Sequence, residues 1–554
     1  MLASLGQLAY APIVFEPALD VPQAGVLLAV PALLLQGLLR HRAKYHALPA
    51  GYYSPETLFL VLAFLALARC RSLEQTRYES PGEWGKLVGL DRIPEVRTLR
   101  TKLGQLCASP GQAAGWSGEL AREWMADQGD RAGVYYADGH VRVYHGSLTE
   151  LPRRYVSRER LCLRGVTDYW VNALAGQPFF VVSQAVTAGL IAALRTHVIP
   201  RLKAEAPGQP SAAALAADPL LIRWVLVFDR EGFSPDFFAE LAAERIAVLT
   251  YHKYPGPPWP EEEFVAQPVS LANGETTSMA LAERGTQLSN GLWMREVRRR
   301  TETGHQTAIL TTSWRTPMTT VAPWMFGRWS QENFFRYMTE HYGLDQLAEY
   351  GTEPLPETTT VVNPAWRQAD RQVRQYQVRL TKNQAAFGQL SLEQPLEPNG
   401  VEAFMQQKSA LQQTVEEQQQ QLQELKRQRQ QTPHHLALKE LPEAQRFQQL
   451  KTEKKHFVDT IKLIAYRAET AMASVVREKL ARAEDARSLL RQLYQTAGDL
   501  HPDEAAKTLT VRLHHQTSAL QDLALAHLCE EINATETIFP GTNLRLVFQL
   551  SGSG

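Results

Sequence analysis

The segment WVLVFDREGFSPDFFAELAAERIAVLTYH, from Trp224 to His252, restricts the possible folds more than any other part of this chain. Two apolar runs, WVLVF and IAVLTY, have the length and composition of buried strands. Between them, Ser234 and Pro235 form a helix-start signal that is followed by a helical pattern. A strand, a helix and a strand in succession are typical of an α/β sheet. The sequence therefore predicts an α/β domain in the middle of the chain.

Further strand signals lie on both sides of this segment. VYYADGHVRVYHG alternates apolar and polar residues around the Asp138-Gly139 step, which predicts a strand and a hairpin. PFFVVSQ predicts a second strand, and SMALAERGT, GLWMREVRRR and QTAILTTS are candidate strands later in the chain. We therefore expect the α/β domain to cover residues 129–350 and to contain a β-rich insertion at about 254–320.

Residues 1–128 have a helical pattern throughout. They contain two apolar runs, VPQAGVLLAVPALLLQGLL and TLFLVLAFLALA. The first run contains Gln, Gly and an internal Pro31, and the second is shorter than the roughly 20 residues that a membrane-spanning helix needs. We therefore predict buried helices of an N-terminal helical domain and no membrane segment.

EWGKLVGLDRIPEVRTLRTKLGQL, at residues 83–106, has the outline of two helices joined by a short turn. As a helix-turn-helix, its second helix would present Arg97, Arg100 and Lys102 to DNA. The alternative is an ordinary solvated face, because Asp91 and Glu95 dilute the positive charge.

The chain changes character after Pro364. Apolar residues recur at alternating steps of three and four in two long segments, which predicts an antiparallel coiled-coil hairpin over residues 363–430. The segments are separated by EQPLEPNG, and the Gln-rich run EEQQQQLQELKRQRQQ could instead be disordered low complexity. Residues 445–554 return to a globular composition, and we expect a mostly helical region with NLRLVFQL as a possible closing strand.

The overall charge and the cysteines exclude several classes of protein. Lys plus Arg and Asp plus Glu both number 58, so no global positive field attracts nucleic acid and any such contact must be local. Cys70, Cys107, Cys162 and Cys529 are too far apart in the sequence for a zinc motif or a disulfide framework. Reduced thiols and the lack of a signal-peptide pattern indicate a cytoplasmic protein.

Three acidic residues occupy positions that packing explains poorly. Asp138 follows VYYA, Asp229 follows WVLVF, and Glu332 lies in the aromatic helical stretch RWSQENFFRYM. An aspartate directly after an apolar strand lies at the strand's carboxyl end, where open α/β sheets place their sites. Each aspartate alone could equally be a turn or helix cap. Together, the three acids occur in the order strand, strand, helix.

This order resembles bacterial insertion-sequence DDE transposases, whose catalytic domain is RNase H-like. YYADGH, VLVFDREGF and RWSQENFF match the family's first Asp, second Asp and Glu, which implies catalytic roles for Asp138, Asp229 and Glu332. The β-rich insertion before the Glu is similar to that of cut-and-paste members that form hairpins at DNA ends. The whole chain also resembles a group of uncharacterised transposases with a tail like KTLTVRLHHQ…FPGTNLRL.

In the best-known branch of that family, the Glu belongs to a Tyr-x2-Arg-x3-Glu-x6-Lys signature. Arg328 and Glu332 keep the spacing of Arg and Glu, whereas Met325 and Thr339 replace the Tyr and the Lys. Arg328 would orient Glu332 or contact a phosphate, although an ordinary surface pair at i,i+4 is the alternative.

The resemblance implies the cofactors and the reaction. Two Mg²⁺ or Mn²⁺ ions, about 3.5–4 Å apart, would be held by the three carboxylates, with Asp138 shared between them. Water would first cut the transposon end, and the freed 3′-hydroxyl would then attack target DNA. We expect double-stranded DNA as the substrate, a homodimer in the synaptic complex and a location at the bacterial nucleoid. The alternatives are an RNase H-like nuclease that does not join strands, an inactive DNA-binding protein and, more distantly, a two-carboxylate glycosidase.

DNA binding also requires local positive charge, because contacts to phosphates dominate the affinity. RRYVSRERLCLR, at residues 153–164, is one candidate outside the N-terminal region. The other two are His252–Lys253 and REVRRR. In the insertion, Trp293 could stack on a flipped base, but we expect a core tryptophan there. The candidate DNA-contacting residues in these two places are Lys253, Arg295, Arg298, Arg299 and Arg300.

Overall fold

The computed structural model describes residues 5–129, 133–156, 159–184, 189–271, 274–390, 401–480 and 482–551. These residues form two compact units. The first contains residues 1–146, 152–351 and 450–554, and the second contains residues 147–151 and 352–449. Most of the three regions that we expected as domains at 1–128, 129–350 and 445–554 falls in the first unit, whereas residues 147–151 and 445–449 fall in the second.

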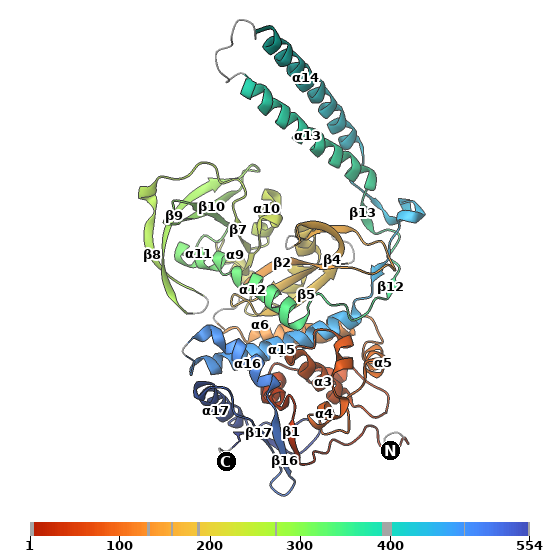
Figure 1. Ribbon diagram of the computed structural model, residues 1–554. Helices are drawn as coiled ribbons and strands as arrows, with labels where there is room; N and C mark the ends of the chain where they lie inside the picture. Colours follow the sequence, from red (N-terminus) through yellow and green to blue (C-terminus); the bar gives the residue numbers. More distant parts are fainter. Residues whose placement is uncertain are drawn as a thin grey trace. The chain divides into compact units, whose positions relative to one another are not determined.

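The first unit is built on a large mixed sheet (Figure 1). At its centre, β2 (Val134–Val143) pairs antiparallel with β4 (Leu161–Asn172), and β4 pairs antiparallel with β5 (Pro178–Gln184). On its other side, β2 pairs parallel with β6 (Trp224–Val227), which pairs parallel with β7 (Ile246–Tyr251). These five strands lie in the order β5-β4-β2-β6-β7. The step at Asp138-Gly139 that suggested a hairpin turn is instead continuous strand within β2.

The insertion strands extend the same sheet beyond β7. The strand β11 (Gln306–Thr311) pairs antiparallel with β7, and β10 (Trp293–Arg300), β9 (Thr276–Gln287) and β8 (Val265–Ser270) follow in order. Each pairing is antiparallel, as expected for strands joined by short turns. At the opposite end, β3 (Arg153–Val156) pairs with the first part of β4.

Short helices pack on this sheet. The helix α10 (Pro235–Ala243) joins β6 to β7 and begins at Ser234, whose hydroxyl accepts from the Phe237 backbone N–H. Phe237 and Phe238 pack on Phe228 next to β6. The others are α7 (Leu190–Ala193), η4 (Leu194–Val198), α8 (Ile199–Glu205), α9 (Ala212–Ala217), η5 (Arg230–Gly232), η6 (Glu261–Glu263), α11 (Met318–Phe326), α12 (Trp329–Tyr337) and η7 (Met338–Tyr342).

A helical layer of the same unit combines segments from both ends of the chain. The long helix α15 (Glu453–Arg477) packs on α1 (Val30–Leu35), α3 (Pro55–Leu67) and α6 (Gln112–Ala126). Nearly every side chain of α3 is buried, which explains its uninterrupted apolar sequence. Within the described residues, no helix is both long and apolar enough to cross a membrane. The smaller elements here are η1 (Ala24–Ala29), α2 (Arg42–Tyr45), η2 (Leu73–Tyr78), α4 (Pro81–Lys86) and α5 (Val96–Leu106).

A second, smaller sheet corrects our description of both ends as helical. The strand β1 (Ala18–Val21) pairs antiparallel with β16 (Gly498–Asp503), and β17 (Thr508–Leu513) and β18 (Arg545–Leu550) complete the order β1-β16-β17-β18. The strand β18 confirms the closing strand that NLRLVFQL suggested. The helix α17 (Ala519–Asn533) packs on β18, while η11 (Ala483–Asp485) and α16 (Ala486–Gln495) follow α15. The N-terminal strand is missed by sequence because it needs a partner almost 480 residues away.

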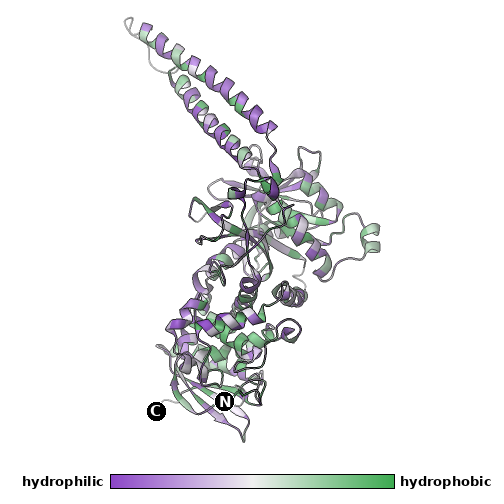
Figure 2. Ribbon diagram, turned by 90° about the vertical axis from the view of Figure 1, so that its right-hand side faces the viewer, coloured by the Kyte–Doolittle hydropathy of each residue, from purple (hydrophilic) through white to green (hydrophobic). Residues whose placement is uncertain are grey.

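The second unit is dominated by α13 (Pro364–Leu390) and α14 (Val401–Gln431). The two helices pack antiparallel, because Asp370 contacts Arg429 and Asn383 contacts Gln418. Val373, Leu380, Leu422 and Leu425 form their apolar seam. Both helices are otherwise largely hydrophilic (Figure 2). The EQPLEPNG connection lies outside the described residues.

The second unit also contains a small strand pair, β13 (Thr360–Val362) with β14 (His435–Ala437). The turns η9 (Leu438–Glu440) and η10 (Glu443–Gln445) follow. The short strands β12 (Thr352–Glu353) and β15 (Gln449–Leu450) lie where the chain passes between the units.

Candidate active site

Asp138 on β2 and Asp229, which follows the end of β6, occupy matching positions on neighbouring parallel segments. Tyr136 on β2 is paired with Val227 on β6, and each aspartate lies two residues further along its strand direction. Because side chains alternate between the faces of a strand, two steps keep each aspartate on the face of its paired residue. The two carboxylates therefore lie side by side at one edge of the sheet.

Arg328 joins the third acid to this pair. Its guanidinium donates to Asp138 Oδ2 at 3.1 Å and to Glu332 Oε1 at 2.8 Å. Arg328 immediately precedes α12 and Glu332 is in its first turn, so the i,i+4 spacing places both on one helix face. The Arg328 side chain is only 13% exposed, so its role differs from that of a surface pair.

The electrostatics of the four groups are coupled. Burial raises the pKa of Asp138 to about 6, and the negative charge of Asp229 adds to that effect while Arg328 opposes it. Burial alone would lower the pKa of Arg328, but the charges of Asp138, Asp229 and Glu332 outweigh it and raise that pKa. Asp138 thus carries an incompletely compensated charge, which is common at functional sites.

Two backbone contacts fix the aspartates. Asp138 Oδ1 accepts from the Gly139 N–H at 2.9 Å. Asp229 Oδ1 accepts from the Glu231 N–H at 2.7 Å and caps η5, so the capping role considered from sequence is real. It leaves the second carboxylate oxygen of Asp229 available for another ligand.

The contacts that hold α12 on the sheet were not apparent from the sequence. Gln331 is buried beside Glu332 and donates to Asn172 Oδ1 at 3.0 Å and to the Trp170 carbonyl at 3.3 Å. Phe334 is buried against Trp170, as its aromatic character predicted. The side chain of Trp329 lies outside what the structure describes. The sequence signal that could have identified Gln331 is an amide residue within an aromatic helical stretch.

The three carboxylates do not form a closed cluster. Within the described parts of the chain, the one group of three His, Cys, Asp or Glu ligand atoms that all lie within 4.8 Å of one another is Asp20, Asp499 and His514. That group lies on the small sheet and contains none of the predicted residues. At the candidate active site, the guanidinium of Arg328 lies between Asp138 and Glu332.

At the two positions that depart from the signature, the Met325 side chain and the Thr339 hydroxyl are buried. Met325 is fully buried in the apolar cluster beneath β6 and β7. The Thr339 hydroxyl is buried and has no hydrogen-bond partner in the described structure. Neither residue is placed to replace the Tyr or Lys.

His140, two residues after Asp138, has a side chain that is only 10% exposed. Its Nε2 lies 2.6 Å from Asp345 Oδ1, and its ring stacks on Phe335 at 5.0 Å. It ties β2 to the segment after η7.

Two of the basic residues proposed to contact DNA are structural instead. Arg295 and Arg298 are buried, and they form ion pairs with Glu283 and Glu296, respectively. Because they are three residues apart, the two arginines lie on opposite faces of β10, and an acid on each face neutralises their charge inside the protein.

The remaining basic candidates lie nearer the surface. Arg299 packs over the Phe326 ring and Arg300 contacts Glu261 at 2.7 Å, while Lys253 is exposed. Arg97 is exposed on α5, Lys102 is half-buried there, and Arg100 forms an ion pair with Glu74. Trp293, expected in the core, is 57% exposed on β10.

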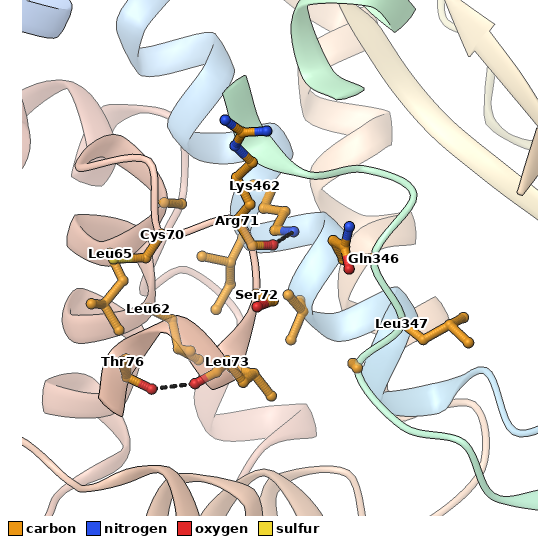
Figure 3. A pocket seen from close by; sticks show the side chains of 14 residues that line it. Leu62, Leu65, Cys70, Arg71, Ser72, Leu73, Thr76, Gln346, Leu347 and Lys462 are labelled. Atoms are coloured by element: carbon orange, nitrogen blue, oxygen red, sulfur yellow. Dashed lines mark hydrogen bonds between the residues drawn. The ribbon is translucent and has the colours of Figure 1, made fainter. Parts of the chain in front are cut away.

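A small pocket between α3 and α15 does not have the dimensions of a substrate site (Figure 3). Its volume is about 30 Å³, which is room for about one water molecule. Leu62, Leu65 and Ile461 supply much of its lining, and Lys462 donates to the Arg71 carbonyl at 3.1 Å. Burial lowers the pKa of Lys462 to about 7, with Lys455 as a further cause.

Comparison with known proteins identifies the family of this chain. A protein-family model described as "Transposase protein" matches residues 1–552. The chain belongs to this transposase family. No curated protein matches the chain in sequence. Membership covers both compact units, so the helical pair and the small sheet are parts of the transposase rather than additions to it. A transposase acts on DNA, which makes the acidic edge of the large sheet and the basic surfaces around it the relevant features.

Proposed function

We propose that this transposase uses Asp138, Asp229 and Glu332 to bind divalent metal ions, cleaves the phosphodiester bonds at the ends of a transposon and joins the freed strands to target DNA. The observation that carries the proposal is the matched placement of Asp138 and Asp229 on neighbouring parallel segments, with Arg328 linking Asp138 to Glu332. An acid pair at the carboxyl edge of a sheet, together with an acid on a helix packed against that sheet, is the arrangement that the DDE resemblance implies.

The strand order supports an RNase H-like core. Three antiparallel strands, β2, β4 and β5, are followed by two strands parallel to the first, in the order β5-β4-β2-β6-β7. The insertion β8–β11 enters after the fifth strand and before the helix with Glu332, as the resemblance to cut-and-paste enzymes implies. We propose that this insertion and α12 border the path of the DNA.

The donor set fits Mg²⁺ or Mn²⁺. Three carboxylates supply hard oxygen ligands, and these ions retain water and substrate oxygens in their remaining positions. Asp138 combines burial with the neighbouring charge of Asp229, and that excess negative charge favours a cation. The bound ions would activate the attacking oxygen and stabilise the leaving oxygen of the phosphodiester.

The residues of the chain have distinct roles in this proposal. Asp138 and Asp229 hold ligand oxygens at the sheet edge, and Glu332 supplies a further carboxylate from α12. Arg328 compensates part of the charge of Asp138 and Glu332 before the substrate binds, and it then donates to a phosphate oxygen near the scissile bond. Gln331 and Phe334 keep α12 in place, which preserves the geometry on which in-line attack depends.

Cleavage of DNA that carries the ends of the source element tests the proposal. With Mg²⁺, the wild-type protein should release products with 3′-hydroxyl ends and then join them to a target duplex. Asp229→Asn should lose both steps, whereas Glu302→Gln, which changes an exposed acid in the turn between β10 and β11, should retain them. Cleavage without joining would identify a nuclease. Equal activity of Asp229→Asn and the wild type would overturn the assignment of the site.

A further inference from the structure

A groove of about 490 Å³ lies directly beside the helix that carries Glu332. One wall is α12 with η7, another is α16, and Tyr466 of α15 lies between them. Its charged lining consists of Arg336, Arg487, Arg491, His341 and Glu340. Three arginines against one glutamate that is 64% exposed make this groove positively charged.

Two of these arginines have no carboxylate partner. Across the described residues, neither Arg336 nor Arg491 forms an ion pair; Arg336 contacts Asn333 Oδ1 at 3.4 Å, and Arg491 contacts Ser488 Oγ at 3.2 Å. A second Arg491 nitrogen lies 3.3 Å from His341 Nε2. Burial, followed by the charge of Arg491, lowers the pKa of His341, which favours a neutral imidazole that accepts this hydrogen bond. The groove therefore presents guanidinium groups that still lack an anion.

The third arginine is fixed in place. Arg487 donates to Thr470 Oγ1 at 2.7 Å and lies over the rings of Tyr337 and Tyr466 at 4.7 and 4.6 Å. It also contacts the buried carboxylate of Glu469 at 3.4 Å. Because these contacts restrict its side chain and Glu469 offsets part of its charge, Arg487 mainly supports the groove wall.

The position of the groove relative to Glu332 indicates its ligand. Arg336 follows Glu332 by one helical turn, which is about 6 Å along the axis. We propose that the groove binds the phosphodiester backbone of the DNA strand next to the cleaved phosphate, with Arg336 and Arg491 as its phosphate contacts. The location of this strand beside a cleaved phosphate rests on the proposed function. The binding of a DNA strand rests on the unpaired arginines and on membership in a transposase family.

The salt dependence of DNA binding tests the groove independently of catalysis. Full-length protein is titrated onto a fluorescein-labelled 40-base-pair duplex of the element's end, in EDTA, over a range of NaCl concentrations. Each phosphate contact contributes about 0.9 to the slope of log affinity against log salt. The double variant R336Q/R491Q should therefore bind at least tenfold more weakly and lose nearly two units of slope.

The matched control is R477Q/R512Q, which removes two exposed arginines from α15 and β17. It should retain the wild-type affinity and slope. If R336Q/R491Q matches this control, the groove does not bind DNA and the proposal is wrong.

Neutral methylphosphonate linkages, placed one at a time in the duplex, locate the contact. At one or two positions adjacent to the cleavage site, the substitution should weaken binding of the wild type and leave R336Q/R491Q unaffected. Sensitivity only at distant phosphates would overturn the placement beside the active site. Failure of the proposed metal-dependent cleavage would leave these measurements unchanged, because they contain no metal.

Discussion

Arg328 donates to Asp138 across 190 residues of sequence, and this contact places the helix with Glu332 against the strand with Asp138. The same guanidinium contacts Glu332, so one cation compensates part of the charge of a three-carboxylate site. Asp138 nevertheless keeps a raised pKa. The metal-free protein therefore stores unfavourable electrostatic energy at the position that the proposed chemistry requires.

The first prediction concerns Asp138→Asn. An amide keeps a hydrogen-bond acceptor for Arg328 and removes the buried charge beside Asp229. Because one pKa unit corresponds to about 1.4 kcal/mol, the metal-free variant should be more stable than the wild type at pH 7.5 by about 1–3 kcal/mol. Urea unfolding measures this, and the same variant should cleave end DNA at least about 100-fold more slowly. A variant that is both less stable and fully active would contradict the assignment.

The second prediction is a pH dependence. The pKa of Asp138 is about 6 in the folded protein and 3.8 in its ordinary state, so the folded state binds the proton more tightly. This contribution to stability is complete below about pH 4 and is lost as the pH rises through 6. Metal ions compete with that proton, so Mn²⁺ affinity should fall by up to tenfold per pH unit below pH 6.

Isothermal titration with Mn²⁺ at pH 5.0, 5.5, 6.5 and 7.5 measures this dependence. Asp138→Asn serves as the reference, since it lacks the titrating group and should show weak binding with little change over this range. The interpretation fails if the wild type binds Mn²⁺ equally well at pH 5.0 and 7.5.

The third prediction concerns Glu469, which is completely buried. It accepts from the Tyr337 and Tyr342 hydroxyls and forms an ion pair with Arg69 at 2.8 Å. Glu469→Gln would leave buried arginines without a counter-charge, so we expect a loss of about 3–5 kcal/mol in unfolding free energy. Glu340→Gln, on the exposed side of η7, should change it by less than about 0.5 kcal/mol. Urea unfolding of both variants measures these changes. Similar losses of unfolding free energy in the two variants would refute the role of Glu469.

The fourth prediction concerns Lys462, which lines the small pocket between α3 and α15 (Figure 3). Its pKa is about 7 in the folded protein, against 10.5 in its ordinary state. Between these values the unfolded chain holds a proton that the folded chain lacks, so stability should rise with pH from 7 towards 10.5. The slope of one such group is at most about 1.4 kcal/mol per pH unit.

Lys462→Met removes that titration. Urea unfolding at pH 7.0, 8.0 and 9.0 should give a smaller rise in stability for the variant than for the wild type. The conservative variant Lys462→Arg remains charged throughout and should also lack the rise. Parallel pH profiles for all three proteins would show that Lys462 stays protonated in the folded state.

The local patterns of the sequence were good predictors of strands and of the helical pair. The runs before Asp138 and Asp229 became paired parallel strands, because continuous apolar residues require burial on both faces. The apolar repeat of the two long segments became the seam between α13 and α14. In each case the deciding interactions recur at short, regular intervals along the chain.

Charge was the least informative signal. REVRRR contains the densest basic run in the insertion, yet Arg295 and Arg298 are buried in ion pairs. No sequence pattern singled out Arg336, Arg487 and Arg491, although these residues line one groove. Whether an arginine is paired depends on acids from other elements, and a linear pattern does not contain that information.

By itself, the sequence determined the order of the elements and the acids that end or follow them, because the strand and helix patterns are set by neighbouring residues. Tertiary structure alone decided that β1 joins the C-terminal sheet, that Arg328 lies between Asp138 and Glu332, and that Glu469 is buried among arginines and tyrosines. These contacts join residues far apart in the chain, and their energies depend on burial and on opposing charges that exist only after the elements have packed.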